Sequence, residues 1–459
     1  METLDSIFQS YADYAWGLPL IVLLIGGGLY LIIRSHFLPF RYLSHALNAL
    51  RGKYDNPNAP GEITHFQALS TALASTIGMG NIAGVAVAIH IGGPGAMFWM
   101  WMSAIIGMST KFFTCTLAVM YRGKGSNGDI QGGPMYYIME GLGKSWKPLA
   151  VFFSICGLIG ALPVFNVNQL KQAINYILLE PNGVAETNTS NFIIGLVLVA
   201  ITAVVILGGL DRISKTASKL VPGMVLLYFV LVMIILGVYI DEVPKYLALM
   251  FTDAFSADNF KGDSFLGGAL GGLILLGVRR GAFSNEAGIG TAPMAHGATK
   301  TTEPVREGLV AMLGPAIDTL VVCTLTALAI LVTGVWQTSE VNGVSLTAAA
   351  FNDAIPVYGN YLLLICIATF SISSLFTYSY YGTKCMSFLF GAHNKHYYNY
   401  FYIASIILGA ITPLSMMLNL IDGTFALMAI PTMTATILLA PKVIREIRAY
   451  GKRMQAQNK

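Results

Sequence analysis

The sequence predicts an all-α polytopic membrane protein with 11 transmembrane helices, arranged as one leading helix and a 5+5 inverted repeat with two broken helices. Three observations predict this fold: an apolar composition, eleven long hydrophobic segments, and glycine-rich interruptions in the second and seventh segments. Of the 459 residues, 55% are hydrophobic and only 11% are charged, with a mean hydropathy of +0.65. Soluble domains carry about 25% charged residues, so a sizeable soluble domain is excluded.

The hydrophobic segments are of the length that crosses a bilayer. They cover residues 15–33, 65–90, 95–121, 148–178, 191–209, 218–240, 264–296, 307–335, 360–390, 398–418 and 424–441. Lys and Arg gather in alternate connections and in the C-terminal tail, while the opposite connections hold mainly Asp and Glu. By the positive-inside rule, the N-terminus is therefore expected outside and the C-terminus in the cytoplasm.

Two interrupted segments predict how the chain is organised. The second segment is interrupted at Gly78–Gly80 and the seventh at Gly277–Gly281. Because the interruptions lie five segments apart, the two helices cross in opposite directions, which is typical of inverted-repeat transporters. The expected regions are an N-terminal segment with the leading helix (1–64), a first repeat (65–242), an extracellular loop (243–263), a second repeat (264–441) and a basic tail (442–459).

The first interruption offers backbone groups to a solute. Broken backbone at membrane depth survives only when it is buried in protein or lines a cavity. The half-helix that begins near Asn81 presents free amides, which suit a carboxylate. The half-helix that ends near 75–77 presents free carbonyls, which suit a cation. The break can thus hold both charges of an amino-acid zwitterion, or a carboxylate beside a metal ion.

Two other segments carry polar side chains. In the ninth segment, the hydroxyls of Ser373 and Ser374 could form part of a neutral oxygen cage for a hard cation. The alternative is that both serines bond to their own helix and aid close packing. In the fourth, Asn166 and Asn168 are either substrate contacts, since amides both donate and accept, or part of an outer half that faces water.

Ionisable residues within the hydrophobic segments usually face the bundle interior and are paired. We expect Arg279, Arg280 and Glu286 to form an internal charge network near the second interruption. Asp318 is a candidate fourth member of this network, and is otherwise either an ion ligand or a hydrogen-bond partner for a broken helix end. His296 is isolated in the sequence and is expected to be structural.

Several classes of function are excluded by what the sequence lacks, and a channel is made a weaker alternative. There is no basic stripe with aromatics for nucleic acid, no HExxH, and no second Asp at the depth of Asp318 for an intramembrane protease. The five cysteines form no metal-binding spacing. A channel would need a continuous pore with rings of carbonyls or charges, whereas these polar groups gather at mid-depth from dissimilar segments.

Four strings carry a resemblance to a known family: STIGMGNIAGVA at 75–86, GGPGAMFWMWMS at 92–103, GGPMYYI at 132–138 and GAFSNEAGIGTAP at 281–293. Along nearly its whole length, the chain resembles the prokaryotic alanine/glycine:cation symporter family. The resemblance implies a LeuT-type inverted-repeat fold with one extra leading helix, and a multi-pass protein of the prokaryotic inner membrane. It implies symport of a small neutral amino acid with Na+ or H+, with no enzymatic activity and no obligatory protein partner.

The resemblance also implies roles for individual residues. Gly78, Met79 and Gly80 match the segment that binds the substrate carboxylate, and Leu276 and Gly277 would offer carbonyls to its ammonium group. One sodium site would be formed by Asn81 and the Thr76 carbonyl. The other would be formed by the carbonyls of Ala74 and Ile77 with the hydroxyls of Ser373 and Ser374.

Three positions depart from the family pattern. Met79 stands where many members carry Thr or Ser, Asn166 where glutamine is expected, and Ser373-Ser374 in place of Thr-Thr. The serines keep their hydroxyls, but Met79 and Asn166 alter the size and polarity of the pocket. Alanine, glycine, serine and glutamine therefore all remain candidate substrates.

The coupling ion is expected to be Na+. The proposed ion sites contain no carboxylate, and a proton needs a titratable acceptor whereas Na+ needs only oxygen atoms. H+ is the alternative, with Glu286 or Asp318 as its carrier.

Overall fold

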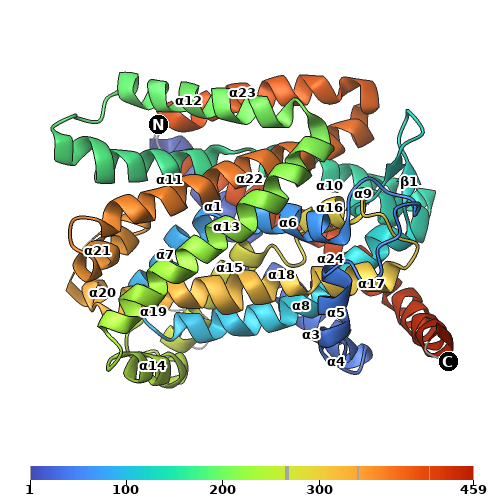
Figure 1. Cartoon of the computed structure of the whole chain (residues 1–459), viewed down its shortest axis with the longest axis horizontal. Helices are drawn as coiled ribbons and strands as arrows, with labels where there is room; N and C mark the ends of the chain where they lie inside the picture. The colour runs from blue at the N-terminus through green and yellow to red at the C-terminus, as the bar shows by residue number, and fades with distance from the viewer. Residues whose placement is uncertain (1, 264–267, 339–340, 413, 458–459) are drawn as a thin grey trace.

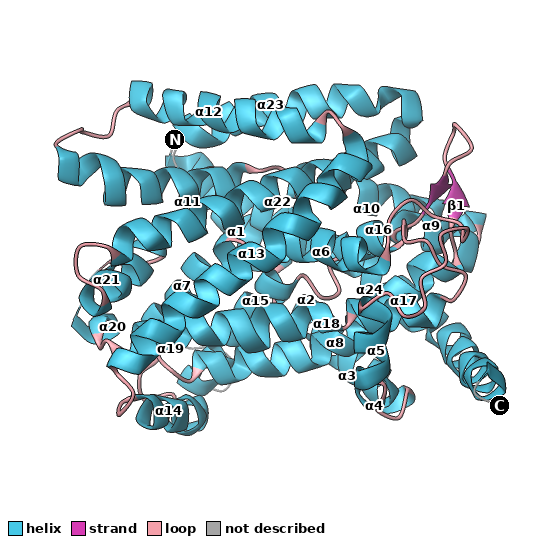
Figure 2. Ribbon diagram, in the orientation of Figure 1, coloured by secondary structure: helices cyan, strands magenta, loops and turns pink. Residues whose placement is uncertain are grey.

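The computed structural model describes residues 2–263, 268–338, 341–412 and 414–457, and these fold into a bundle of helices with one small hairpin (Figures 1 and 2). The N-terminal region contains α1 (Glu2–Ala15), α2 (Leu18–Ile21), η1 (Val22–Gly26), α3 (Gly27–Arg34), α4 (Leu38–Arg41) and α5 (Leu43–Leu50). Helix α1 packs against the C-terminal helix α24 (Leu414–Gln457). The contact is made in the first part of α24, at Asp422 and Thr424, and the later part of α24 runs to the opposite side of the molecule (Figure 1).

The first half of the bundle follows in chain order. It contains α6 (His65–Thr76), η2 (Gly80–Gly84), α7 (Val85–Gly92), α8 (Ala96–Met120), β1 (Gly123–Lys124), β2 (Ile130–Gln131), α9 (Pro134–Tyr137), η3 (Ile138–Leu142), η4 (Lys144–Trp146), α10 (Lys147–Gly160), α11 (Val164–Ile174), η5 (Asn175–Leu179), η6 (Glu180–Asn182), α12 (Asn188–Ile206) and α13 (Gly209–Val238). The strands β1 and β2 pair antiparallel, with Gly123 opposite Gln131.

The second half begins with a helix where the sequence predicts a loop over 243–263. It contains α14 (Val243–Ser256), α15 (Gly268–Asn285), α16 (Thr291–His296), α17 (Pro304–Ala311), α18 (Leu313–Pro315), η7 (Ala316–Cys323), α19 (Thr324–Val332), α20 (Val335–Thr338), α21 (Val344–Ala354), α22 (Gly359–Phe390), η8 (Ala392–Asn394), α23 (Lys395–Ile411) and α24. Helix α23 lies beside α12 along one edge of the molecule (Figure 1).

Within the described residues, eight helices are long and apolar enough to cross a membrane, and nine if the bent pair α6 and η2–α7 is one span. The two other predicted segments correspond to α15 with α16, and to α23, which has 17 residues. The multi-pass helical fold is therefore confirmed, while the count of eleven spans stays a prediction.

The first interruption lies where the sequence predicts it. Helix α6 ends at Thr76, η2 begins at Gly80, and the two halves of the span are bent by 53°. At its start, α6 is fixed by a capping box in which Thr64 and Gln67 each satisfy the other's backbone amide. The α-helical pattern ends as the Ile77 amide donates to the Leu73 carbonyl at 2.7 Å.

The predicted second interruption at Gly277–Gly281 is wrong, because α15 continues through it to Asn285. A Cβ at Gly277 would lie 2.5 Å from Trp99 Cβ, and one at Gly281 would lie 2.8 Å from Ser103 Cβ. These glycines, spaced by four residues, let α15 approach α8 closely, which is a common use of glycine in membrane helices.

The actual second break spans residues 286–290, between α15 and α16. Glu286, Gly288 and Gly290 adopt positive φ angles of 54°, 88° and 108°. Gly288 and Gly290 supply conformations that most residues avoid, and Pro293 lies in the first turn of α16. The Thr432 hydroxyl donates to the buried carbonyl of Ile289 within the break at 3.0 Å. Two broken helices are therefore present, with the second break about two and a half helical turns beyond its predicted place.

The two broken helices run in opposite directions. Helix α6 packs against α16, and the start of α6 meets the end of α16 at Glu307. On the other side of the breaks, η2 and α7 pack against α15. This opposed arrangement agrees with the direction reversal predicted from the odd number of segments between the breaks.

One end of the bundle gathers the segments that are rich in Lys and Arg, and we call it the basic end: residues 51–64, 121–133, 297–303, 384–395 and the C-terminal part of α24. There the Arg122 guanidinium donates to the carbonyls of Gly297, Pro60 and Thr301 at 2.9, 3.0 and 3.1 Å. Lys384 of α22 donates to the Gln131 side chain on the hairpin. These contacts fix the loops against the ends of α6 and α16.

Candidate substrate and ion site

Gly78 brings three elements together at the first break. A Cβ at this position would lie 2.7 Å from the Ser374 hydroxyl of α22 and 3.5 Å from Asn166 Oδ1 of α11. The backbone of Gly78 therefore faces a hydroxyl and an amide oxygen at close range. Met79 and Asn81 beside it are fully buried, so the break is enclosed by protein, as unwound backbone in a membrane requires.

Asn81 holds the shape of the break and links it to Asp318. Its side-chain oxygen Oδ1 accepts from the backbone amide of Gly78 at 3.1 Å, and the backbone amide of Asn81 donates to the Gly78 carbonyl at 3.2 Å. Its Nδ2 donates to the Asp318 carboxylate at 2.6 Å. Ser284 and Thr319 donate to the same carboxylate at 2.8 and 2.7 Å.

Asp318 lies beside one of the expected ion sites. The sequence leaves open whether Asp318 binds an ion or supports a broken helix, and the structure shows it bonded to the side chain that supports the first break. Asp318 is not among the expected ion ligands, but its contact with Asn81 Nδ2 places a carboxylate beside one of the expected ion sites. Asp318 lies in η7, a π-helical stretch of the kind that often marks functional sites.

The two serines of the ninth segment meet the end of α6 as expected. Ser374 Oγ lies 3.0 Å and Ser373 Oγ 3.4 Å from the Ala74 carbonyl oxygen, and Ser374 Oγ is 3.5 Å from the Ser75 carbonyl. Ser373 and Ser374 are 1% and 0% exposed. Hydroxyl and carbonyl oxygens thus converge at one buried place, without a carboxylate, which is a donor set that suits Na+.

The two asparagines of α11 point in different directions. Residues two apart on a helix lie about 200° apart around its axis. Asn166 faces the break, whereas Asn168 Nδ2 donates to the Thr412 carbonyl at 3.3 Å. The expectation that Asn168 contacts the substrate is therefore wrong, and its amide instead supports the end of α23.

Leu276 and Gly277 lie inside the uninterrupted helix α15. Carbonyls in the interior of an α-helix accept the hydrogen bonds of the helix itself. The expectation that these two carbonyls are free to bind an ammonium group is wrong for this reason.

The expected charge network of Arg279, Arg280, Glu286 and Asp318 is not formed. Arg279 pairs with Asp422 at 2.8 Å and Asp13 at 3.2 Å, which ties α15 to α24 and α1. Glu286, at the second break, instead accepts from Tyr378 and Thr291, and lies 3.5 Å from the Ser75 hydroxyl. Glu286 therefore connects the second break to α22 and to the end of α6.

An aromatic pair lies beside the break on the side away from the basic end. Phe165 and Phe283 have ring centroids 5.5 Å apart, and a Cβ at Gly80 would lie 3.7 Å from the Phe283 ring. Beyond the pair is a pocket of about 280 Å³ whose lining includes Phe165 and Arg280. Ala83 and Gly84 of η2 also line this pocket, so it adjoins the helix that follows the first break.

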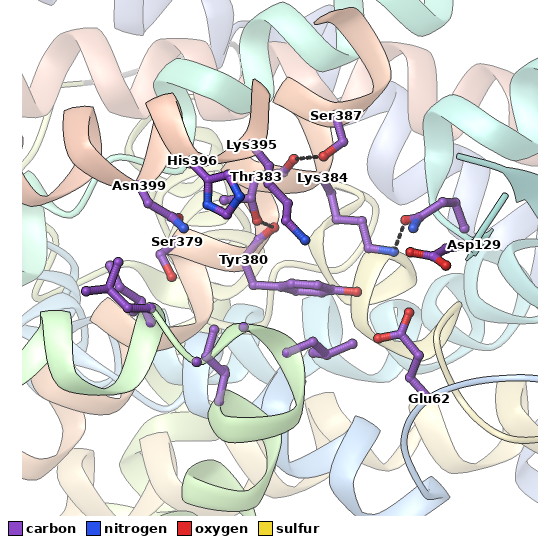
Figure 3. A pocket seen from close by; sticks show the side chains of 17 residues that line it. Glu62, Asp129, Ser379, Tyr380, Thr383, Lys384, Ser387, Lys395, His396 and Asn399 are labelled. Carbon is purple, nitrogen blue, oxygen red and sulfur yellow. Dashed lines mark hydrogen bonds between the residues drawn. The ribbon is translucent and has the colours of Figure 1, made fainter. Parts of the chain in front are cut away.

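A second pocket of about 320 Å³ lies at the basic end, between α22, the start of α23 and the junction of α12 with α13 (Figure 3). Lys384 is 5% exposed, and its ammonium group lies 5.3 Å from the Tyr380 ring centroid. Glu62 and Asp129 line the side toward which Lys384 points (Figure 3). Ser379 lines the same pocket, less than two helical turns from Ser374 along α22.

Three side chains of the site escaped the sequence analysis. Ser284, Thr319 and Tyr378 lie in apolar segments and belong to no spacing that distinguishes them from packing residues. A signal for the second break was present, however. The string Gly288-Ile289-Gly290, followed by Pro293, repeats the Gly-x-Gly pattern of the first break at Gly78–Gly80.

Comparisons with known proteins agree with this geometry. The model of the sodium:alanine symporter family matches residues 1–459. The sodium/alanine symporter AgcS of Methanococcus maripaludis is 38% identical over 457 residues, which cover 97% of each chain. The probable sodium/glutamine symporter GlnT of Bacillus subtilis is 35% identical, over 99% of this chain and 92% of its own.

Among solved structures, MhsT in complex with L-phenylalanine superimposes with a TM-score of 0.60 at 14% identity, over 83% of this chain and 89% of that chain. This likeness shows the fold, and the expected LeuT-like architecture is confirmed by it.

Proposed function

The chain belongs to the sodium:alanine symporter family, and we propose that it is a secondary active symporter that couples inward Na+ movement to uptake of a small neutral amino acid. The observation that carries the proposal is the first break, where the Gly78 backbone, the Asn166 amide and the Ser374 hydroxyl meet in a buried place.

The substrate carboxylate binds the amides at the start of η2, next to Gly78, Met79 and Gly80. The first amides of a helix have no partner within the helix and carry the positive end of its dipole. Asn166 Oδ1 accepts from the substrate ammonium group. The buried Met79 side chain narrows the pocket, which favours alanine, glycine or serine over larger amino acids.

Two ion sites flank the carboxylate. One is formed by the Ala74 and Ile77 carbonyls with the hydroxyls of Ser373 and Ser374, and the gathering of the Ala74 carbonyl with both hydroxyls supports it. The other is formed by the Thr76 carbonyl and Asn81 Oδ1. That oxygen has two lone pairs, so it can accept from the Gly78 amide and still bind an ion.

Asp318 supports a second candidate mechanism, in which H+ replaces one Na+. Its carboxylate is fully buried beside Asn81 and can hold a proton. Glutamine is the second candidate substrate, because Asn166 adds an amide to the pocket and GlnT is named for glutamine. With the basic end in the cytoplasm, the pocket that contains Lys384 is the release path for either substrate.

Uptake into proteoliposomes tests the proposal. Radiolabelled alanine, glycine, serine and glutamine are supplied with and without an inward Na+ gradient, and separately with an inward proton gradient. Accumulation of alanine, glycine or serine that depends on Na+ is the expected result. Uptake that follows the proton gradient and ignores Na+ would instead support the mechanism through Asp318. A folded protein that accumulates none of the four would refute the proposed substrate class.

A further inference from the structure

Two histidines and one glutamate form a buried cluster at the basic end, remote from the first break. His65 is the first residue of α6, His296 is the last of α16, and Glu307 lies in α17. The Nδ1 atom of each imidazole contacts a different oxygen of the Glu307 carboxylate, and the three side chains are at most 1% exposed. A single carboxylate therefore joins the ends of both broken helices, and His296 is not isolated.

The backbone around the cluster joins the same two segments. Ile63 and Thr299 form a parallel bridge, the Glu62 amide donates to the Ala298 carbonyl at 2.7 Å, and the Lys300 amide donates to the Ile63 carbonyl at 2.7 Å. Opening a path at this end between α6 and α16 would have to break these bonds and the contacts to Glu307. The cluster thus lies at the closure of the basic end.

The hydrogen-bond pattern leaves one nitrogen of each imidazole unused. A carboxylate accepts only, so both Nδ1 atoms donate to Glu307, and in a neutral ring Nε2 is then an acceptor. Both Nε2 atoms are buried and, within the described part of the chain, have no hydrogen-bond partner. Such atoms are rare in folded proteins and call for an explanation.

The surroundings of the two rings differ. His65 Nε2 lies 3.9 Å from the Asp55 carboxylate, which is 37% exposed to solvent. For His296, the described residues supply one carboxylate, that of Glu307. A proton on His65 would therefore sit between two carboxylates, and one of them reaches the solvent.

We propose that His65 is a proton-binding site, filled from the solvent at the basic end through Asp55, and that its imidazolium form locks α6 to α17 and α16. The Glu307 carboxylate already makes this a charge-assisted hydrogen bond, and protonation of His65 adds the attraction between two opposite charges. The ligand is thus a proton, and its effect is to hold this end of the protein closed. The consequence for uptake rests on the proposed function, whereas the proton site does not.

The other charged and titratable groups around the cluster are Arg122, Arg306 and the Cys115 thiol. Arg122 is held by backbone carbonyls of residues 60 and 297–301, and Arg306 donates to the Tyr54 carbonyl at 3.2 Å. The two guanidiniums oppose a further positive charge. Both carboxylates, however, lie within 4 Å of the His65 ring, so the nearest groups favour the proton.

The proton site is tested directly by NMR of the purified full chain with ¹⁵N-labelled histidine. In a pH series from 5 to 8, the signal that is lost in His65→Gln is expected to change as the imidazole gains its proton. In Asp55→Asn, the midpoint should move down by about 0.5 pH unit, the size expected for a partly exposed ion pair. A His65 signal that keeps one ionisation state across this range would overturn the proposal. If His65→Gln does not fold, the shift in the exposed-site variant Asp55→Asn decides the matter.

The lock is tested in proteoliposomes by changing the pH on each side of the membrane separately. Uptake by the native chain should be about fivefold slower at pH 6 than at pH 8 on the side of the basic end. His65→Gln should remove this dependence, and the exposed control His393→Gln should keep it. A native pH dependence that survives in His65→Gln would refute the lock. If no amino acid is taken up under any condition, the proposed function fails, while the NMR titration still decides the proton site.

Discussion

A methyl group at Gly78 is expected to damage ion binding before it damages folding. In Gly78→Ala, the new Cβ would lie 2.7 Å from Ser374 Oγ, about 0.7 Å closer than the ordinary contact limit of 3.4 Å. The φ angle of Gly78 is not positive, so alanine fits the backbone itself. Ser374 must therefore move away, and its hydroxyl loses the 3.0 Å contact with the Ala74 carbonyl. That carbonyl and that hydroxyl are both proposed ligands of the same Na+.

The size of the effect follows from the contacts that are lost. One hydrogen bond of this kind contributes about 1 kcal/mol, and displacement of one ion ligand adds at least a similar amount. A loss of about 1.4 kcal/mol is tenfold in affinity. The Na+ concentration for half-maximal uptake should therefore rise at least about tenfold in Gly78→Ala.

Gly84→Ala is the matched control, because Gly84 lies in the same broken span and a Cβ there would meet nothing within 4 Å. Its Na+ dependence should stay within about twofold of the native value, since the added methyl group meets no neighbouring atom and removes no ion ligand, a change that costs at most about 0.5 kcal/mol. The assay is uptake in proteoliposomes across a series of Na+ concentrations, with the amount of folded protein measured for each variant. Native Na+ dependence in Gly78→Ala would show that the Ala74–Ser374 pair does not bind the coupling ion.

Three further predictions address the other parts of the site. Gly80→Val should insert normally yet abolish uptake, because a branched side chain blocks access to the backbone, and native uptake would move the substrate site elsewhere. Asp318→Asn should slow uptake at least tenfold, because it weakens the hydrogen bond that holds the Asn81 side chain. Calorimetry would show whether this variant still binds the substrate, and native rates with native Na+ dependence would remove Asp318 from the mechanism. Gly281→Leu should destabilise the protein by about 1–3 kcal/mol, because its Cβ already meets Ser103 at 2.8 Å, and an unchanged melting temperature would contradict the close packing of α15 on α8.

The sequence predicted the first break and missed the place of the second for one physical reason. At Gly78–Gly80 the glycines stand beside polar residues in an apolar segment, so the sequence pattern itself marks the place of the break. In the seventh segment, glycine serves two purposes. Gly277 and Gly281 allow close packing, while Gly288 and Gly290 provide positive φ angles. Composition alone does not separate a packing glycine from a conformational one.

Partners across long stretches of chain were the harder part to predict. The contact between Asn81 and Asp318 joins residues 237 positions apart, and that between His65 and Glu307 joins residues 242 apart. The expected grouping of Ser373 and Ser374 with the Ala74 carbonyl was available only through the family resemblance. By contrast, Arg279 was expected to pair with Glu286, which is close to it in the sequence. In the structure Arg279 pairs with Asp13 of α1 and Asp422 of α24.

Helix α6 offers a physical link between the ion site and the basic end. It has 12 residues, so it is about 18 Å long and behaves as a short rigid rod. One end carries Ala74 and is held by the serines of α22, while the other carries His65 and is held by Glu307. A rod held at both ends cannot swing until both contacts weaken. Loss of the ion from the Ala74 carbonyl and loss of the proton from His65 would therefore act on the same movement of α6. The Na+ dependence and the pH dependence of uptake should be measured in Gly78→Ala, in His65→Gln and in the variant that carries both changes. If the two act through α6, their effects on uptake will not be additive; independent sites would give additive effects within about 0.5 kcal/mol.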